Sequence, residues 1–316
     1  MLENLKFVQG AIAKKDLVPA LTHFRIKDGR VESYNGVLAL SGPIPLTLEA
    51  QPKAIPFIRA IQTCKDTIQM HLTPAGKLQV RSGVFKANIE CLQEAFVETR
   101  PEGDVVELEG NLLGHLKAIE PFIAEDASKP WARGILLRGQ SAFATNNVIL
   151  VEKWLGYDFP VEVNIPRAAV IELLRIGEEP LSLQVAKNNV TFHFSNERWL
   201  RTQTLSLEWP DLARVLDKLG TTVAFPPTFW EALESLKPFV NELEQVYLSP
   251  GSVATHTDLQ MGAIVEVPGL EATGCFNLHQ LAALESIADQ IDLSVYPAPC
   301  PFIGKLLRGA IVGMRF

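Results

Sequence analysis

The chain has 316 residues, of which 47% are hydrophobic and 21% charged, a composition typical of a globular protein with two or three domains. Its formal net charge of −7 disfavours a protein that binds nucleic acid over its whole surface. No apolar run approaches the roughly 20 residues of a membrane span, and the cysteines form no Cys-x-x-Cys pair. We therefore expect a cytoplasmic protein with no membrane contact, no disulfide framework, no metal and no cofactor.

Two sets of amphipathic helices are predicted along the chain. In the first set, apolar residues recur at i, i+3 and i+7. These stripes begin at Leu5, Leu116 and Leu233, roughly 110 to 120 residues apart. The second set opens at Ile55-Pro56, Ile165-Pro166 and Phe276-Asn277, with a similar spacing. Proline is tolerated in the first turn of a helix, and Asn277 is suited to cap one.

After each helix of the second set, the pattern changes to a period of two, which is typical of antiparallel strands with one buried face. Turn residues such as Asn188-Asn189 separate the members of a pair. The predicted strand pairs are 67–72 with 77–80, 181–185 with 190–194, and 291–295 with 309–316.

The same order of elements occurs three times, so we predict an α+β protein of three repeated domains. Each domain holds two helices packed on antiparallel sheets. The expected domains are 1–103, 104–218 and 219–316. The alternative is that helices and alternating strands recur by chance, as they do in other α+β proteins.

The second repeat carries motifs that go beyond periodicity. VNIPRAAVIELLRI at 163–176, LSLQVAKNNVTFHF at 181–194 and LSLEWPDLARVL at 205–216 closely resemble the bacterial sliding clamp, the beta subunit of DNA polymerase III. The resemblance extends to Val80-Arg81-Ser82-Gly83 and to the ending Val312-Gly313-Met314-Arg315-Phe316. It implies a DNA clamp fold and a head-to-tail homodimer that closes into a ring around duplex DNA. Such a protein is not an enzyme, because it tethers DNA polymerase to its template by enclosure.

The predicted helices carry cations that could line the hole of such a ring. Cations confined to the bore of an otherwise acidic ring would let it slide on DNA without sequence preference. His115 and Lys65 also stand on these helices, and the third repeat is poorer in cations. A solvated helix face is the alternative for each residue. The expected DNA-facing residues are Lys6, Lys14, Lys15, Lys53, Arg59, Lys117, Arg167 and Arg175.

In the clamp family, the C-terminal residues help to form a hydrophobic cleft that takes short peptides of DNA polymerase and of the clamp loader. The resemblance therefore gives a role to an apolar chain end, although Phe316 could instead complete a core strand. Apolar walls with a few polar groups suit a peptide site. The expected cleft consists of Thr145, Leu150, Pro210, Arg214, Val215, Val312, Met314, Arg315 and Phe316.

The sequence departs from the family pattern at this cleft. The family's Asp-Gly-His-Arg-Leu segment appears as Asn146-Asn147-Val148-Ile149-Leu150, without the histidine and the arginine. The bound peptide is therefore expected to differ, and the divergence suggests a phage or mobile-element origin.

Closure of the ring would join an edge strand of the first domain to one of the third domain in the other subunit. By resemblance, these edges lie near 85–92 and 260–267. Ile89 and Ile264 are candidate anchors of the dimer interface, although each could instead face the core of its own domain.

Two rival functions remain open. One is a clamp-like protein that binds clamp partners without encircling DNA. The other is an enzyme with an unrecognised site, although the chain has no GxGxxG, GxxxxGK[ST], HExxH or GxSxG motif and its histidines show no ligand spacing.

Overall fold

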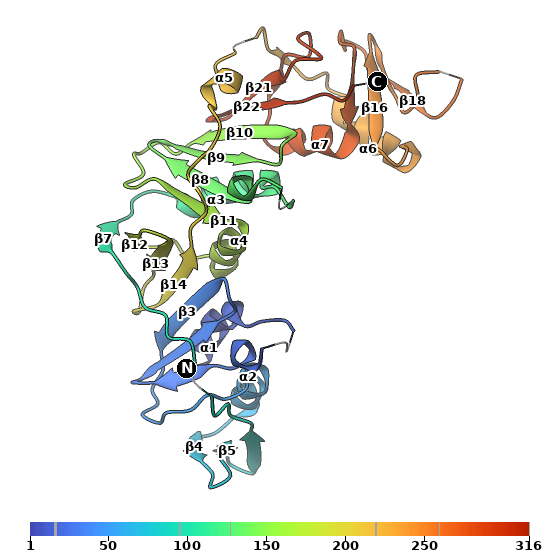
Figure 1. Ribbon diagram of the computed structural model, residues 1–316. Helices are drawn as coiled ribbons and strands as arrows, with labels where there is room; N and C mark the ends of the chain where they lie inside the picture. Colours follow the sequence, from blue (N-terminus) through green and yellow to red (C-terminus); the bar gives the residue numbers. More distant parts are fainter. Residues whose placement is uncertain (16–17, 95, 127, 219, 259, 316) are drawn as a thin grey trace. The chain divides into compact units, whose positions relative to one another are not determined.

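The computed structural model describes residues 1–15, 18–94, 96–126, 128–218, 220–258 and 260–315. The chain divides into two compact units (Figure 1). Unit 1 comprises Met1–Glu109 and Ala168–Thr204, and unit 2 comprises Gly110–Arg167 and Leu205–Phe316. Within the described ranges, no helix is long and apolar enough to span a membrane.

Unit 1 contains a seven-stranded sheet and a three-stranded sheet, both antiparallel. The larger sheet has the order β1 (Arg25–Lys27), β2 (Arg30–Tyr34), β3 (Leu38–Pro43), β14 (Trp199–Gln203), β13 (Asn189–His193), β12 (Ser182–Ala186) and β7 (Asp104–Glu107). The smaller sheet has the order β4 (Gln69–Leu72), β5 (Leu78–Ser82) and β6 (Phe85–Ile89).

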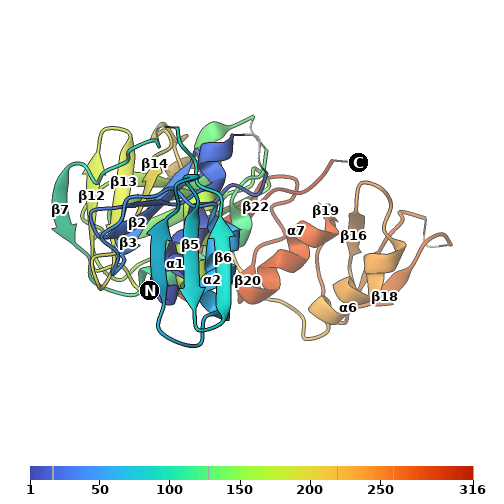
Figure 2. The ribbon, with the colours of Figure 1, turned by 90° about the horizontal axis from the view of Figure 1, so that it is seen from below.

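The helices of unit 1 pack their apolar faces on these sheets. They are α1 (Leu2–Val8), α2 (Ala54–Thr63) and α4 (Arg167–Ile176), whose first residue belongs to unit 2, with the short helices η1 (Gln9–Ala11) and η2 (Pro19–Thr22). Helix α1 lies on β2 and β3 with Leu5, Phe7 and Val8 buried, and α2 lies on β6 (Figure 2). These residues follow the predicted apolar stripe, which explains why the helices form where they do.

Unit 2 contains an eight-stranded sheet and a four-stranded sheet, again antiparallel. The larger has the order β11 (Val163–Pro166), β8 (Gly134–Arg138), β9 (Ser141–Thr145), β10 (Ile149–Trp154), β22 (Leu307–Ile311), β21 (Cys300–Gly304), β20 (Gln290–Ile291) and β15 (Val223–Ala224). The smaller has the order β18 (Ile264–Glu266), β17 (Ser252–Ala254), β16 (Gln245–Ser249) and β19 (Gly274–Asn277).

The helices of unit 2 also pack on strands that follow them in the sequence. Helix α3 packs on β9 and β10, and α6 packs on β17, β18 and α7. The bounds are α3 (Leu112–Ile119), α5 (Ala213–Leu216), α6 (Phe229–Leu236), α7 (Leu278–Ala282), η3 (Glu120–Phe122), η4 (Pro130–Ala132), η5 (Lys237–Phe239) and η6 (Ala283–Ser286).

The order of elements repeats three times, as predicted: a helix, a three-stranded meander, a second helix and a second meander. The α+β class and the antiparallel sheets are therefore confirmed. Each large sheet joins the first meander of one repeat to the second meander of the next, through the pairs β3 with β14 and β10 with β22. Because each such seam lies inside one unit, the compact units cut across the second repeat, and the boundaries of the three domains stay a prediction.

Most predicted elements are found, but the predicted pair of 291–295 with 309–316 is wrong, because β20 and β22 each pair with β21, which was not predicted. Asn277 caps α7 as predicted, because its Oδ1 accepts a hydrogen bond from the Gln280 N–H at 3.0 Å. The strand predicted over 291–295 stops at Ile291, and 309–316 is a strand only to Ile311. After Ile291, the Asp292 carboxylate accepts hydrogen bonds from the backbone N–H and the hydroxyl of Ser294, which turns the chain out of the sheet.

The seam between β10 and β22 leaves no room for a side chain at Gly309. A Cβ there would overlap the Leu150 carbonyl oxygen and the Phe302 ring, whereas a Cβ at Gly42 on β3 would meet only side-chain atoms, the nearest 3.4 Å away. We expect Gly309→Ala to lower the free energy of unfolding by about 2 kcal/mol. The matched variant Gly42→Ala should change it by less than about 0.5 kcal/mol. Urea unfolding followed by circular dichroism measures both, and equal effects would contradict the close approach at Gly309.

Candidate functional site

An apolar groove with a volume of about 250 Å³ lies in unit 2, beside the seam between β10 and β22. The strand end at β9, the turn into β10, the segment before α5 and the end of β22 form its walls. Five predicted cleft residues line it: Thr145, Leu150, Pro210, Val215 and Val312. Asn147, Val148 and Ile149 also line it and belong to the segment that the sequence comparison placed at the cleft. The sequence prediction missed the other lining residues, which are Lys129, Trp131, Asp211, Leu212, Pro299 and Ala310.

A small apolar cluster holds the segment before α5 against the sheet. Leu136 on β8, Phe143 on β9 and Leu216 on α5 are buried together, and Leu150, Trp209 and Leu212 pack against them. The rings of Trp131 and Trp209 also contact each other, with centroids 4.9 Å apart and their planes inclined at 56°. This wall of the groove is therefore anchored by packing, although the segment contains only one short helix.

Hydrogen bonds from two side chains fix the turn between β9 and β10. The Thr145 hydroxyl donates to the Ile149 carbonyl oxygen at 2.8 Å, and Asn146 Oδ1 accepts from the backbone N–H groups of Val148 and Ile149. Asn147 has a φ of +73°, a conformation that asparagine tolerates better than most residues. The Asn146-Asn147 pair therefore builds a tight turn just before Val148 and Ile149, the positions at which the histidine and arginine of the resembled pattern are missing.

The chain end is docked, but only part of it reaches the groove. The Val312 N–H donates to the Val148 carbonyl oxygen at 2.9 Å, and the Val312 side chain lines the groove with 43% of its surface exposed. Met314 is bound elsewhere, because its N–H donates to the Cys275 carbonyl oxygen at 2.7 Å and its carbonyl oxygen accepts from the Tyr296 hydroxyl. Neither Met314 nor Arg315 lines the groove, and Phe316 lies outside the described residues.

The predicted cleft residue Arg214 also lies outside the groove lining. Its guanidinium is largely exposed and stands 4.0 Å from the Asp211 carboxylate, an ion pair between i and i+3 on the solvent side. Such a contact contributes little to stability. Arg214 therefore stands at the rim rather than in the wall.

The cations predicted to face DNA fall into three groups: paired, half-buried and exposed. Arg167 is paired with Glu120 at 3.4 Å and Glu125 at 2.6 Å, and Arg175 is paired with Glu172 at 2.6 Å while donating to the Phe7 carbonyl oxygen. Their charges are therefore already balanced by neighbouring carboxylates. Lys53 is half-buried at the start of α2. The exposed members, for which the described residues offer no ion-pair partner, are Lys6, Lys14, Lys15, Arg59 and Lys117.

His115 on α3 contributes no positive charge at neutral pH. Burial, and next the nearby Lys153 ammonium, lower the pKa of its imidazole below the usual 6.5. Its Nδ1 is buried with no hydrogen-bond partner among the described residues. Lys117, two residues later and exposed, is the cation that α3 offers to solvent.

The two candidate interface residues are placed differently. Ile89 on β6 is only 3% exposed, so it faces the core of its own unit, which was the alternative for this residue. Ile264 on β18 is 47% exposed. Both strands stand at the edge of their sheets.

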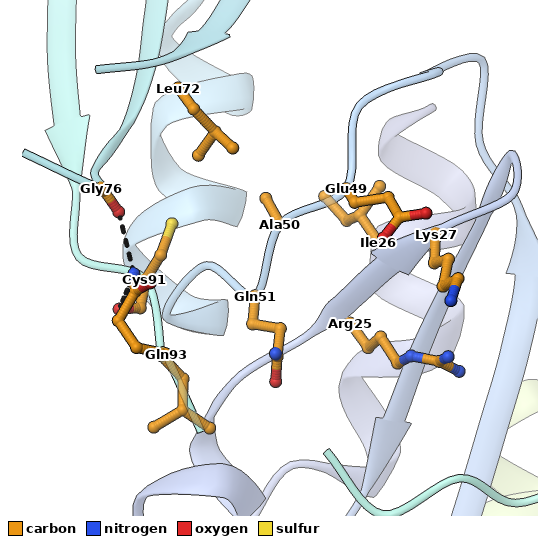
Figure 3. Close-up of a pocket in the computed structure, with 11 residues that line it drawn as sticks. Arg25, Ile26, Lys27, Glu49, Ala50, Gln51, Leu72, Gly76, Cys91 and Gln93 are labelled. Atoms are coloured by element: carbon orange, nitrogen blue, oxygen red, sulfur yellow. Dashed lines mark hydrogen bonds between the residues drawn. The ribbon is translucent and has the colours of Figure 1, made fainter. Parts of the chain in front are cut away.

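A second cavity, of about 270 Å³, lies in unit 1 between β1 and the β4–β6 sheet (Figure 3). Polar side chains such as Gln51 and Gln93 line it together with Cys91. Burial raises the pKa of the Cys91 thiol, which disfavours the thiolate that a nucleophile requires. Among the residues placed by the structure, no group of histidine, cysteine and carboxylate side chains could hold a metal ion.

Comparison with solved structures identifies the fold. The Caulobacter crescentus beta sliding clamp matches with a TM-score of 0.83 at 15% identity, and the DNA polymerase sliding clamp of Bacillus subtilis with 0.83 at 14%. The DNA polymerase III subunit beta of Pseudomonas aeruginosa matches with 0.81 at 18%. Each match covers 100% of this chain and 97% of the other. No protein-family model and no curated protein matches the sequence. The predicted DNA clamp fold is thus confirmed.

The low pKa of His115 gives a testable pH dependence. Because the folded state resists protonation of this imidazole, its contribution to stability is present above the unfolded pKa near 6.5 and is lost as the pH falls through the folded pKa. We expect the stability of His115→Gln, relative to that of the parent chain, to increase as the pH falls from 8 to 5.5. Urea unfolding of both proteins at each pH measures this difference. Parallel pH profiles would contradict the assignment.

Proposed function

We propose that the protein is a sliding clamp, a ring-shaped homodimer that encircles duplex DNA and tethers DNA polymerase for processive synthesis. The observation that carries the proposal is the match of the whole chain to bacterial beta sliding clamps, with 100% of this chain covered and a TM-score of 0.83. Fold alone does not fix function, so the groove and the sheet edges supply the testable content. In this role the protein catalyses no reaction and needs no cofactor.

The groove is the proposed docking site for short peptide segments of the polymerase and the clamp loader. Trp131, Leu150 and Val312 offer apolar surface, while Lys129 and Asp211 at its lining offer charges that can orient a peptide. A docked peptide would keep a partner bound to the ring without contacting DNA. The departures at Val148 and Ile149, which replace a histidine and an arginine of the resembled pattern, support a peptide preference that differs from that of the matched clamps.

For DNA, the structure favours weak contact by a few exposed cations. Lys6, Lys14, Lys15, Arg59 and Lys117 remain candidates for phosphate contact, whereas the charges of Arg167 and Arg175 are balanced. A ring with few phosphate contacts would have low affinity for DNA but would stay threaded on it. The net charge of −7 agrees with such a mode, since it disfavours binding outside the bore.

The register at the two seams within the chain supports a specific geometry of ring closure. At one seam Glu152 on β10 stands opposite Arg308 on β22, and at the other Ser41 on β3 stands opposite Trp199 on β14. Glu152 and Ser41 hold equivalent places in their meanders. Each pairs with the residue of the middle strand that lies two positions after the pair closing the first hairpin. Arg308 and Trp199 are equivalent too, each one residue after the pair that closes its hairpin. Both seams therefore share one register.

The third repeat lacks such a seam within the described chain, because β18 and β6 are sheet edges. Ile264 on β18 is the equivalent of Glu152, and Lys86 on β6 is the equivalent of Arg308. Transfer of the register places Ile264 opposite Lys86 of the partner subunit, with Val265 opposite Phe85 of the partner subunit. Pairing by β-augmentation at two such edges would close a dimeric ring.

A clamp-like protein that binds partners without encircling DNA is the second candidate. Docking at the groove would be common to both functions, whereas only a ring needs the β18–β6 pairing. The second of the two following experiments therefore separates them.

The first experiment tests the groove. We expect a fluorescent peptide of the Gln-Leu-x-Leu-Phe type to bind the full chain with micromolar affinity, and Val312→Glu to weaken it at least about tenfold by placing a charge on an apolar wall. The matched control Leu243→Glu adds the same charge at a residue that is 60% exposed and outside the groove, so it should bind as the parent does. Equal affinity of both variants would contradict docking here. Removal of Met314–Phe316 then tests whether the tail contributes.

The second experiment tests ring closure. In a Cys64→Ser, Cys91→Ser background, the pair Lys86→Cys and Ile264→Cys should form disulfide-linked dimers, since paired strand residues lie within disulfide reach. The control pair Lys86→Cys and Glu266→Cys is offset by two residues on the same face and should link poorly. Dimers that are loaded on circular DNA and then crosslinked should stay on the DNA at high salt but should be lost when the DNA is linearised. Crosslinked dimers that are not retained on circular DNA at high salt would favour the clamp-like alternative.

A further inference from the structure

The groove has a charged counterpart at the same place in the preceding repeat. Leu136 on β8 and Phe143 on β9 are a cross-strand pair that carries the apolar cluster under the groove wall. Their equivalents in the preceding repeat, counted from the two-residue hairpin turns, are Arg25 on β1 and Glu32 on β2. These two side chains form an ion pair with 2.8 Å between a guanidinium nitrogen and a carboxylate oxygen. In each repeat, the segment that leads to the next repeat crosses this face of the sheet. The same position in the fold is thus apolar in one unit and ionic in the other.

A cavity of about 400 Å³ lies over this ionic position. The connecting segment contributes Thr99, Arg100 and Pro101 to its wall, as 210–215 does at the groove. Its lining holds four cations against two carboxylates, in a protein whose formal net charge is −7. The charged lining residues are Arg25, Lys27, Arg30, Arg100, Asp28 and Glu32.

The cations differ in how much of their charge is available. Arg25 is 16% exposed and held by Glu32 and by Glu98, so it forms a fixed part of the wall. Lys27 lies beside Arg25 on the same face of β1 (Figure 3) and forms no ion pair with any described residue. Arg30 pairs with Glu197 at 3.8 Å and donates to the Ser41 hydroxyl at 2.9 Å, so it too is a fixed part of the wall. Arg100 pairs at 3.5 Å with Glu98, a carboxylate that it shares with Arg25, but 81% of its side chain is exposed. Lys27 and Arg100 are therefore the groups that an incoming anion can reach.

We propose that this cavity, lined by Lys27, Arg30 and Arg100, docks an acidic peptide segment of a protein partner. Separate carboxylates fit cations that are interrupted by Asp28 and Glu32, whereas a continuous phosphate backbone would be repelled by them. Nucleic acid is further disfavoured because Trp199, the aromatic residue of the lining, is only 7% exposed and offers no stacking platform. The site goes beyond the proposed clamp function and does not require ring closure.

The probe is a fluorescein-labelled decapeptide of alternating Asp and Ala, bound to the full chain at low salt and followed by anisotropy. We expect saturable binding that weakens about fivefold or more in the double variant Lys27→Gln, Arg100→Gln. The matched control Lys65→Gln, Lys77→Gln removes the same charge from exposed residues of unit 1 outside the cavity, and should weaken binding less than about twofold. Urea unfolding checks that both variants fold.

Three outcomes would overturn the proposal. The first is no saturable binding, and the second is equal weakening in the test and control variants, which would indicate binding to net charge alone. The third is tighter binding of a ten-residue oligo(dT) with the same dependence on Lys27 and Arg100, which would assign the surface to nucleic acid. The Gln-Leu-x-Leu-Phe peptide should bind all variants equally, so failure here is distinguishable from failure of the groove.

Discussion

The need to pair the open edge of each first meander governs this fold. Buried backbone N–H and C=O groups must be hydrogen-bonded. The last strand of a meander has a neighbour on one side only, so its outer N–H and C=O groups need a strand from elsewhere in the chain. Strand β3 meets this need with β14, and β10 meets it with β22. Each repeat is therefore completed by the next one, and the large sheets run through the boundaries between repeats.

The same pairing determines where binding surfaces can form. At a seam, the segment that connects two repeats must cross the sheet, and the crossing leaves a hollow beside it. In unit 2, Leu136 and Phe143 make this hollow apolar, whereas in unit 1 Arg25 and Glu32 make it ionic. One backbone arrangement thus supports two chemically different surfaces, because the outward-facing residues of the strands are free to vary without disturbing the core.

Periodicity was sufficient to predict the helices, the repeats and the Asn277 cap, because each depends on residues close together in sequence. It failed at 292–295, where an Asp side chain competes with the sheet for backbone N–H groups. Trp131 and Pro299 of the groove were missed because they come from irregular segments with no pattern.

The charges show a second limit of sequence reasoning. Arg167 was interpreted as a free cation, yet one of its partners, Glu120, is far away in sequence, so no local pattern could reveal the pair. The partner of Arg175, Glu172, stands at i−3 on the same helix and could have been recognised. Ile89 was ambiguous for another reason. Alternation marks two faces of a strand but does not say which face is covered.

The two edge strands proposed to close the ring, β6 and β18, carry charges that have a consequence for how the chain behaves before assembly. An exposed edge is a template on which any extended segment can add, so a chain awaiting its partner is prone to aggregation. Strand β6 carries Lys86 and β18 carries Glu266, both exposed. Like edges would bring like charges together, while unlike edges would bring opposite ones. In the proposed ring, these charges would therefore discourage association of identical edges during biosynthesis and favour the head-to-tail pairing.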